Sequence, residues 1–179
     1  MAVYISLTAI GKDKLGIVST VSKVLADKNC NIEDSTMTIL FGHFAMILII
    51  TLPKKLSVST LFSQLKKNTA PLGILLSYSP INYVLKKKII ADNFIISVYG
   101  SDKTGIVYNV CQYLANKKIN ITDVQTSLLK NKNTKVYIMI IETEIPKKLG
   151  IEIISKELNV LAKNLDVSIS LNKAETSKI

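Results

Sequence analysis

The chain has 179 residues, of which 48% are hydrophobic and 20% charged, so it can bury a sizeable core and is not disordered as a whole. Its net charge of +10 comes from 23 lysines and no arginine. Because arginine is the side chain that forks onto guanine and phosphate, its absence argues against direct nucleic-acid recognition. The longest apolar run, Phe44 to Ile50, is far shorter than the roughly 20 residues of a membrane-spanning helix. Met1 to Ile10 has no signal-peptide features, so we expect no membrane contact and a cytoplasmic location.

The first half of the chain predicts six elements in the order βαββαβ. Apolar and β-branched residues that stop at Gly11 indicate a strand, and Val18, Val21 and Leu25 recur at helical spacing. Ser57 is a suitable N-cap for the second helix. The predicted set is a strand at 3–10, a helix at 15–28, strands at 32–40 and 44–52 joined across Gly42-His43, a helix from Ser57 to Leu65, and a strand at 74–78.

The second half predicts the same order. Its elements are a strand at 94–99, a helix carrying Val107, Val110, Cys111 and Leu114, strands at 121–129 and 136–142, a helix carrying Ile151, Ile154, Leu158 and Leu161, and a strand at 167–171. Each half is therefore predicted to be a ferredoxin-like α+β domain, an antiparallel sheet with helices on one face. The predicted domains are residues 1–82 and 92–172, with a connector at 83–91 and a polar tail at 173–179.

The two halves repeat each other in sequence. Residues 11–34 match residues 100–123 at an offset of 89, with 13 of 24 positions identical and no gap. Further on, residues 52–56 match residues 145–149 at an offset of 93. The four extra residues of the second copy are expected at the tip of its hairpin, around residues 131–133, because loop tips tolerate insertion.

Two strands are apolar almost throughout, at residues 44–50 and 136–141. A sheet with one face open to water normally alternates apolar and polar residues. We therefore expect the second sheet face to be covered by the sister domain or by another chain, in a domain pair that also forms a homodimer.

The repeated loop between the first strand and helix has the spacing of two glycines found in phosphate-binding loops. Gly11 and Gly16 fit G-x-x-x-x-G, but that motif also needs lysine and serine or threonine after the second glycine. Ile17-Val18 and Ile106-Val107 stand there instead, which excludes the nucleotide interpretation.

Two interpretations of the loop remain. In the first it only starts a helix: glycine permits the sharp turn, and Asp13 or Asp102 caps the helix. In the second it binds a zwitterion: the free N–H groups of the helix N-terminus receive a carboxylate, Asp13 receives an ammonium group, and Asn31 adds an amide. The recurrence of asparagine at positions 31 and 120 favours the second interpretation, which predicts a free amino acid as ligand.

The motif strand–Gly-x-Asp-x-x-Gly-Ile-Val–helix–Asn-Ile-x-Asp–hairpin resembles the ACT domain, a small regulatory module that binds amino acids. The resemblance covers about residues 3–82 and 92–172. Leu15 and Thr104 stand where ACT domains often have proline. The ligand positions that the resemblance implies are Gly11, Asp13, Leu15, Gly16 and Asn31 in the first copy and Gly100, Asp102, Thr104, Gly105 and Asn120 in the second. The resemblance also implies that such sites usually lie between paired domains, with Asn31 at the domain interface, so a loop and an asparagine that share a ligand can come from different domains.

Two ACT domains with nothing else attached are similar to the glycine cleavage system transcriptional repressors. That likeness implies a sensor of a small amino acid, such as glycine, that contacts a DNA-binding transcription activator rather than DNA. Two alternatives stay open. One is an interaction module without ligand, and the other is a regulatory subunit that acts on an amino-acid or one-carbon enzyme, for example a formyltetrahydrofolate deformylase.

The remaining reactive residues carry no recognisable catalytic or metal site. His43, the single histidine, is predicted at a hairpin turn, and Cys30 and Cys111 have neither a CxxC partner nor a neighbouring histidine. No carboxylate pair or nucleophile–base pair is visible. We therefore expect a non-enzymatic protein without cofactor or metal.

Overall fold

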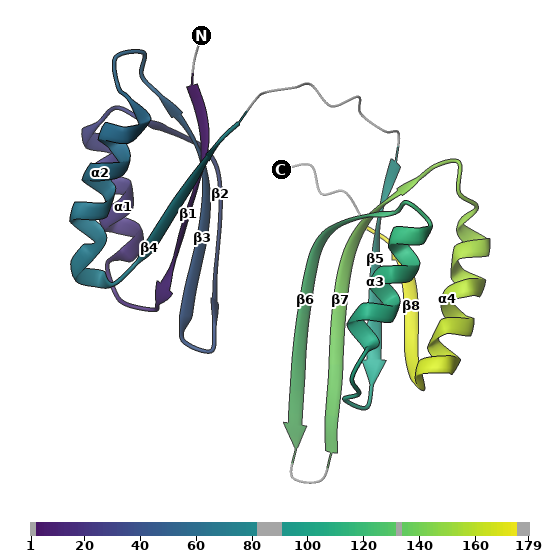
Figure 1. Ribbon diagram of the computed structural model, residues 1–179. Helices are drawn as coiled ribbons and strands as arrows, with labels where there is room; N and C mark the ends of the chain where they lie inside the picture. Colours follow the sequence, from purple (N-terminus) through teal and green to yellow (C-terminus); the bar gives the residue numbers. More distant parts are fainter. Residues whose placement is uncertain (1–2, 82–90, 132–133, 175–179) are drawn as a thin grey trace. The chain divides into compact units, whose positions relative to one another are not determined.

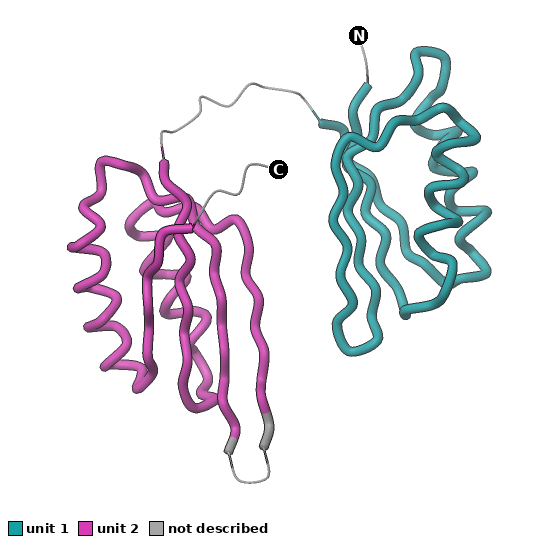
Figure 2. Tube along the Cα trace, turned by 180° about the vertical axis from the view of Figure 1, so that it is seen from behind, with its two compact units in different colours: residues 1–86 teal, residues 87–179 magenta. Residues whose placement is uncertain are grey.

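The chain forms two compact units, residues 1–86 and 87–179 (Figures 1 and 2). The computed structural model describes residues 3–81, 91–131 and 134–174. Most of the expected connector and tail, at 82–90 and 175–179, lie outside the described residues, as do Lys132 and Asn133 of the second hairpin. Each unit is an α+β domain with the predicted order βαββαβ, and in each the helices cover one face of an antiparallel sheet.

Unit 1 has the strand order β2-β3-β1-β4, with both long helices on one face (Figure 1). A 3-10 turn that the sequence did not predict, η1, follows α2 and ends at Gly73, whose φ is 71°. The elements are β1 (Val3–Lys12), α1 (Ile17–Asp27), β2 (Asn31–Leu40), β3 (His43–Leu52), α2 (Val58–Thr69), η1 (Ala70–Leu72) and β4 (Leu75–Pro80).

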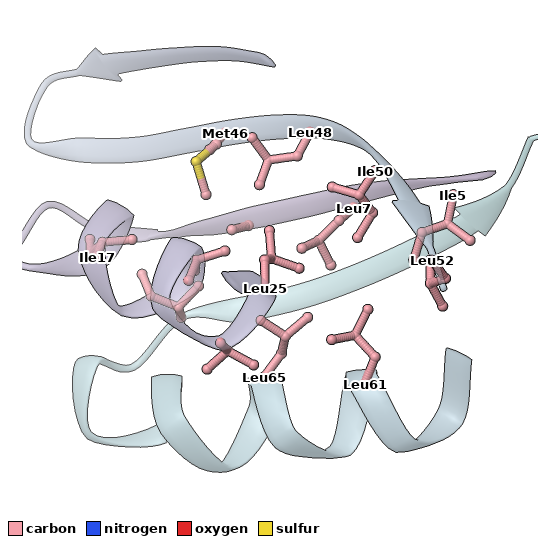
Figure 3. Packing of buried hydrophobic residues seen from close by; sticks show 14 of the residues in the cluster. Ile5, Leu7, Ile17, Leu25, Met46, Leu48, Ile50, Leu52, Leu61 and Leu65 are labelled. Carbon is pink, nitrogen blue, oxygen red and sulfur yellow. The ribbon is translucent and has the colours of Figure 1, made fainter. Parts of the chain in front are cut away.

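Burial in unit 1 alternates along the central strands β1 and β3, although β3 is apolar almost throughout. The side chains that point toward the helices are buried and form the core in Figure 3, whereas Ile47 on the opposite face is 44% exposed. Opposite residues of an antiparallel pair share a face, so Thr8 and Thr36, the partners of Ile47, belong to the same open face. Within the unit, only one sheet face is covered. The expectation that another domain or chain covers the second face remains a prediction.

Unit 2 has the equivalent strand order β6-β7-β5-β8, again with its helices on one face (Figure 1). A half-buried cluster joins its helices: Tyr113 Oη donates to Glu157 Oε2 at 2.8 Å, and Lys117 Nζ lies 2.7 Å from Glu157 Oε1. The elements are β5 (Ala91–Gly100), α3 (Ile106–Asn116), β6 (Asn120–Asn131), β7 (Thr134–Pro146), α4 (Ile151–Leu165) and β8 (Val167–Lys173).

The strand registers place the four extra residues at the predicted hairpin tip. Leu40 pairs with His43 around a turn of two residues, whereas the equivalent pair, Leu129 with Val136, encloses six. The additional residues lengthen the β6–β7 ladder by two pairs, Lys130–Lys135 and Asn131–Thr134.

Candidate functional site

The repeated loop in unit 1 ends at a helix that is capped by glycine. Gly16 is the N-cap of α1, with a φ of 91°, and its carbonyl oxygen accepts the N–H of Thr20 at 2.9 Å. No side chain of the described residues caps the helix. The alternative in which Asp13 is the cap is wrong, because the helix begins three residues after it. The N–H groups of the first turn therefore have no side-chain acceptor. They provide a local site for an anion.

Unit 2 repeats this geometry. Gly105 is the N-cap of α3 with a φ of 97°, again without a side-chain cap, so Asp102 does not cap its helix either. The carbonyl oxygen of Gly105 accepts both the backbone N–H of Asn109 at 2.9 Å and its Nδ2 at 2.8 Å. A positive φ is unfavourable for residues with a Cβ, which explains why glycine recurs at both positions.

The first glycine of each loop has a packing role. A Cβ at Gly11 would lie 2.7 Å from Ile74 Cδ1 and 3.1 Å from the Gly73 carbonyl oxygen. A Cβ at Gly100 would lie 2.6 Å from Val167 Cγ1 and 3.2 Å from its Cα. These glycines allow the outer strand of each sheet to start close to the central one, so their recurrence is explained without a ligand.

The aspartate of each loop, Asp13 or Asp102, is exposed to solvent. Neither the Asp13 nor the Asp102 carboxylate has a hydrogen bond or ion pair within the part of the chain that the structure describes. Leu15 and Thr104, next to the N-cap glycines, are also exposed. Each loop thus presents a carboxylate a few residues from an open helix N-terminus, the pairing that complements the ammonium and carboxylate groups of a free amino acid.

Tyr137 of strand β7 is a candidate that the sequence interpretation missed. Its hydroxyl is buried and has no hydrogen-bond partner among the described residues. Burial raises the pKa of Tyr137, with smaller contributions from the charges of Asp102 and Cys111. Tyr137 pairs with Gly100 in unit 2, as Phe44 pairs with Gly11 in unit 1. Alignment of the two copies at the offset of 93 residues places Tyr137 opposite Phe44, so the sequence contained the signal for this added hydroxyl.

Asn31 and Asn120 do not lie with the loops of their own units. Asn31 starts β2 opposite Thr51, which pairs with Tyr4, whereas the loop follows Lys12 at the other end of β1. Eight residues of strand separate the two ends, about 26 Å. Asn120 is likewise paired with Glu144, which pairs with Asn93, at the end of β5 away from its loop.

Each asparagine instead bonds a neighbouring carboxylate. Asn31 Nδ2 donates to Glu33 Oε1 at 3.0 Å, and the Thr51 hydroxyl donates to the same oxygen at 2.6 Å. The hydrogen bonds from Thr51 and Asn31 lower the pKa of Glu33. Asn120 Nδ2 donates to Glu144 Oε2 at 2.9 Å. Loop and asparagine could share a ligand only if they came from different domains or chains.

The other reactive side chains form no cluster. Cys30 and Cys111 are half-buried free thiols whose pKa values are raised by burial, and His43 is exposed as the first residue of β3. Within residues 3–81, 91–131 and 134–174, no group of three or more His, Cys, Asp or Glu side chains is placed to hold a metal ion. In the same ranges, no helix is both long enough and apolar enough to cross a membrane.

These features define a tandem of ferredoxin-like domains, each with an open, glycine-capped helix N-terminus beside a free carboxylate. The ACT domain family model matches residues 4–79 and 92–172. The chain belongs to the ACT domain family and contains two copies of the domain. ACT domains are regulatory modules, so this is an ACT-domain regulatory protein.

Curated relatives match one stretch of the chain. UPF0237 proteins of Methanocaldococcus jannaschii and Methanopyrus kandleri are 41% and 42% identical to it over 69 residues, which is 38% of this chain and 77% of each relative. Their match is thus to about one domain's length.

Solved structures match both domains together. A protein of unknown function from Galdieria sulphuraria has a TM-score of 0.84 and 26% identity, over 98% of this chain and 100% of that one. A protein proposed to be a glycine cleavage system transcriptional repressor has a TM-score of 0.67 and 20% identity, over 98% of this chain and 99% of that one. At this identity the second likeness is one of fold alone.

Proposed function

We propose that this protein is a non-enzymatic regulator that binds a small free amino acid, such as glycine, at residues 11–16 and 100–105. The observation that carries the proposal is the same in both units. A helix N-terminus without a side-chain cap stands beside an exposed aspartate that has no hydrogen bond or ion pair among the described residues. The helix N–H groups would receive the ligand carboxylate, and Asp13 or Asp102 would receive its ammonium group.

The signal would pass to a protein partner. Membership of a regulatory family supports action through a partner, and we propose a DNA-binding transcription activator for that part. The lack of arginine among 23 basic residues supports action through this partner rather than on DNA. A cytoplasmic location fits this role.

A second candidate, an interaction module without ligand, is equally compatible with the packing of the glycines. Gly11 and Gly100 are required by the close approach of the outer strands, and Gly16 and Gly105 by their positive φ. The glycines therefore do not distinguish the two functions. The aspartates do, because neither carboxylate has a hydrogen bond or ion pair in the described part of the chain.

Substitution of both aspartates separates the candidates. The double variant Asp13→Asn and Asp102→Asn removes the charges for the ammonium group but changes no cap, so its thermal melt without ligand should match that of the wild type. For the wild type, an amino acid at ten times its Kd should add about 1.4 kcal/mol, or roughly 6–11 °C for a domain of this size. The double variant should lose that shift. An equal shift in both proteins would exclude the proposed site, and no shift with any amino acid would favour the interaction module.

A further inference from the structure

The two candidate ligand loops are held in different ways. In unit 1 the sheet holds the start of the loop: Lys12 still pairs with β3, and the Asp13 N–H donates to the Gly42 carbonyl oxygen at 2.8 Å. In unit 2 the β5–β7 ladder already ends at Gly100. Residues 101–104 therefore leave the sheet earlier than their counterparts in unit 1.

An ion pair ties the loop of unit 2 to the end of helix α4. Lys103 Nζ donates to Asp166 Oδ2 at 2.8 Å, and 63 positions of sequence separate the two residues. A hollow of about 490 Å³ borders the loop and the helix at this point, with Ser101 and Lys163 in its lining. Loop and helix are therefore not closely packed here, and the ion pair bridges them.

Aspartate is unfavourable at position 166 by local rules. Asp166 is the C-cap residue of α4, where the helix dipole disfavours a negative charge, and its φ of 53° lies in the left-handed region that glycine prefers. Gly73 stands at the equivalent position of unit 1, with a φ of 71°. Lys14, the counterpart of Lys103, forms no ion pair within the described residues. The contact with Lys103 therefore accounts for the aspartate at the end of α4.

We propose that Asp166 is a positioning residue of the unit 2 site, because its ion pair with Lys103 holds residues 102–105 in place for the ligand. This inference rests on the proposed function, since it adds a residue to the same site. A loop that is ordered before binding loses less conformational entropy when the ligand arrives. The ion pair also neutralises the Lys103 ammonium group, which would otherwise repel the ammonium group of a ligand at the neighbouring Asp102.

The two sites should then respond differently to salt. The side chains of Lys103 and Asp166 are 47% and 83% exposed, so dissolved ions screen their attraction. The hydrogen bond from Lys103, and then its charge, lower the pKa of Asp166, so the carboxylate stays ionised at neutral pH. The backbone hydrogen bond from Asp13 to Gly42 joins uncharged groups and is not screened in this way. Salt should therefore weaken the unit 2 site more than the unit 1 site.

NMR relaxation of the ¹⁵N-labelled full chain tests the positioning without ligand. Asp166→Asn removes the charge and keeps a residue that tolerates the positive φ. The order parameters of residues 102–104 should fall below the rigid value of about 0.85 in this variant, whereas those of residues 12–14 should not change. Asp27→Asn breaks another exposed ion pair, with Lys23 inside α1, and is the matched control that should change neither loop.

Titration of the same proteins with glycine measures the effect on binding. An exposed ion pair is worth at most a factor of about five in an equilibrium, so Asp166→Asn should weaken binding at residues 105–108 by about two- to fivefold. Binding at residues 16–19 should not change. About 0.5 M NaCl should likewise weaken the unit 2 site of the wild type more than the unit 1 site.

The outcomes separate this inference from the proposed function. Unchanged order parameters in Asp166→Asn, or equal weakening of both sites by this variant, would overturn the positioning role. Saturable shifts at neither site of the wild type would count against the proposed function instead. The order parameters of the ligand-free protein would then still decide whether Asp166 holds the loop.

Discussion

Gly100→Ala tests whether the repeated glycines serve packing. The new Cβ would lie 2.6 Å from Val167 Cγ1, 3.0 Å from its Cβ and 3.2 Å from its Cα, so the first residue of β8 must move. Overpacking of this kind costs about 1 to 3 kcal/mol, and the restricted unfolded chain returns about 0.4 to 1 kcal/mol. We expect a net loss of about 0.5 to 2 kcal/mol in the stability of unit 2.

Gly11→Ala is the matched control in unit 1. Its closest contact, at 2.7 Å, is Ile74 Cδ1, the end of a flexible side chain. Its closest backbone contact is the Gly73 carbonyl oxygen at 3.1 Å, so we expect a smaller loss of about 1 kcal/mol or less. Urea unfolding followed by far-UV circular dichroism gives the change, and amide exchange in β5 and β8 assigns it to unit 2. A neutral or stabilising Gly100→Ala would refute the packing role. Loss of an amino-acid response at unchanged stability would instead place the ligand against Gly100.

Two further predictions concern caps and charge. Asp13→Ala should change the free energy of unfolding by less than about 0.5 kcal/mol, because the Asp13 carboxylate caps no helix. Ser57→Ala should lower the free energy of unfolding by about 1 kcal/mol, because the Ser57 hydroxyl accepts a backbone N–H of α2 at 3.1 Å. Equal losses in urea unfolding would contradict this contrast. The hydrogen bonds from Lys117 and Tyr113 lower the pKa of Glu157 in the folded protein. The contribution of Glu157 to stability is therefore complete above the pKa of glutamate in the unfolded chain, about 4.3. It is lost as the pH falls through the lower pKa of the folded state. Glu157→Gln should flatten this acid dependence in thermal melts between pH 6 and 3, and an unchanged slope would show that the cluster does not stabilise the fold.

The sequence repeat predicted the order of the elements, because it aligned two independent copies of each strand and helix. The ends were less accurate, since pairing decides where a strand stops. Gly11 was expected to end the first strand, but Gly11 and Lys12 remain in β1 because Phe44 and His43 pair with them. The turn η1 was not predicted, because three residues leave no periodic pattern.

The candidate site was only partly accessible from the sequence. The glycines and aspartates of the loop stand out because they recur, but recurrence alone could not separate packing at Gly11 from a ligand role. The zwitterion interpretation grouped Asn31 with the loop because the two are close in sequence, while the family resemblance allowed them to come from different domains. Helix α1 carries the chain about 17 Å back along the sheet, so Asn31 starts at the opposite end. Tyr137 was missed because it differs between the copies instead of recurring.

The most direct test of amino-acid sensing is an NMR titration of the ¹⁵N-labelled full chain with individual free amino acids. A ligand held as proposed must perturb the amides of Gly16 to Ser19 and of Gly105 to Tyr108, because those N–H groups would bind its carboxylate. We predict saturable shifts at one or both sets for a small amino acid such as glycine, and none for the corresponding amine without a carboxylate. The absence of saturable shifts in both sets with every amino acid at millimolar concentration would contradict the account.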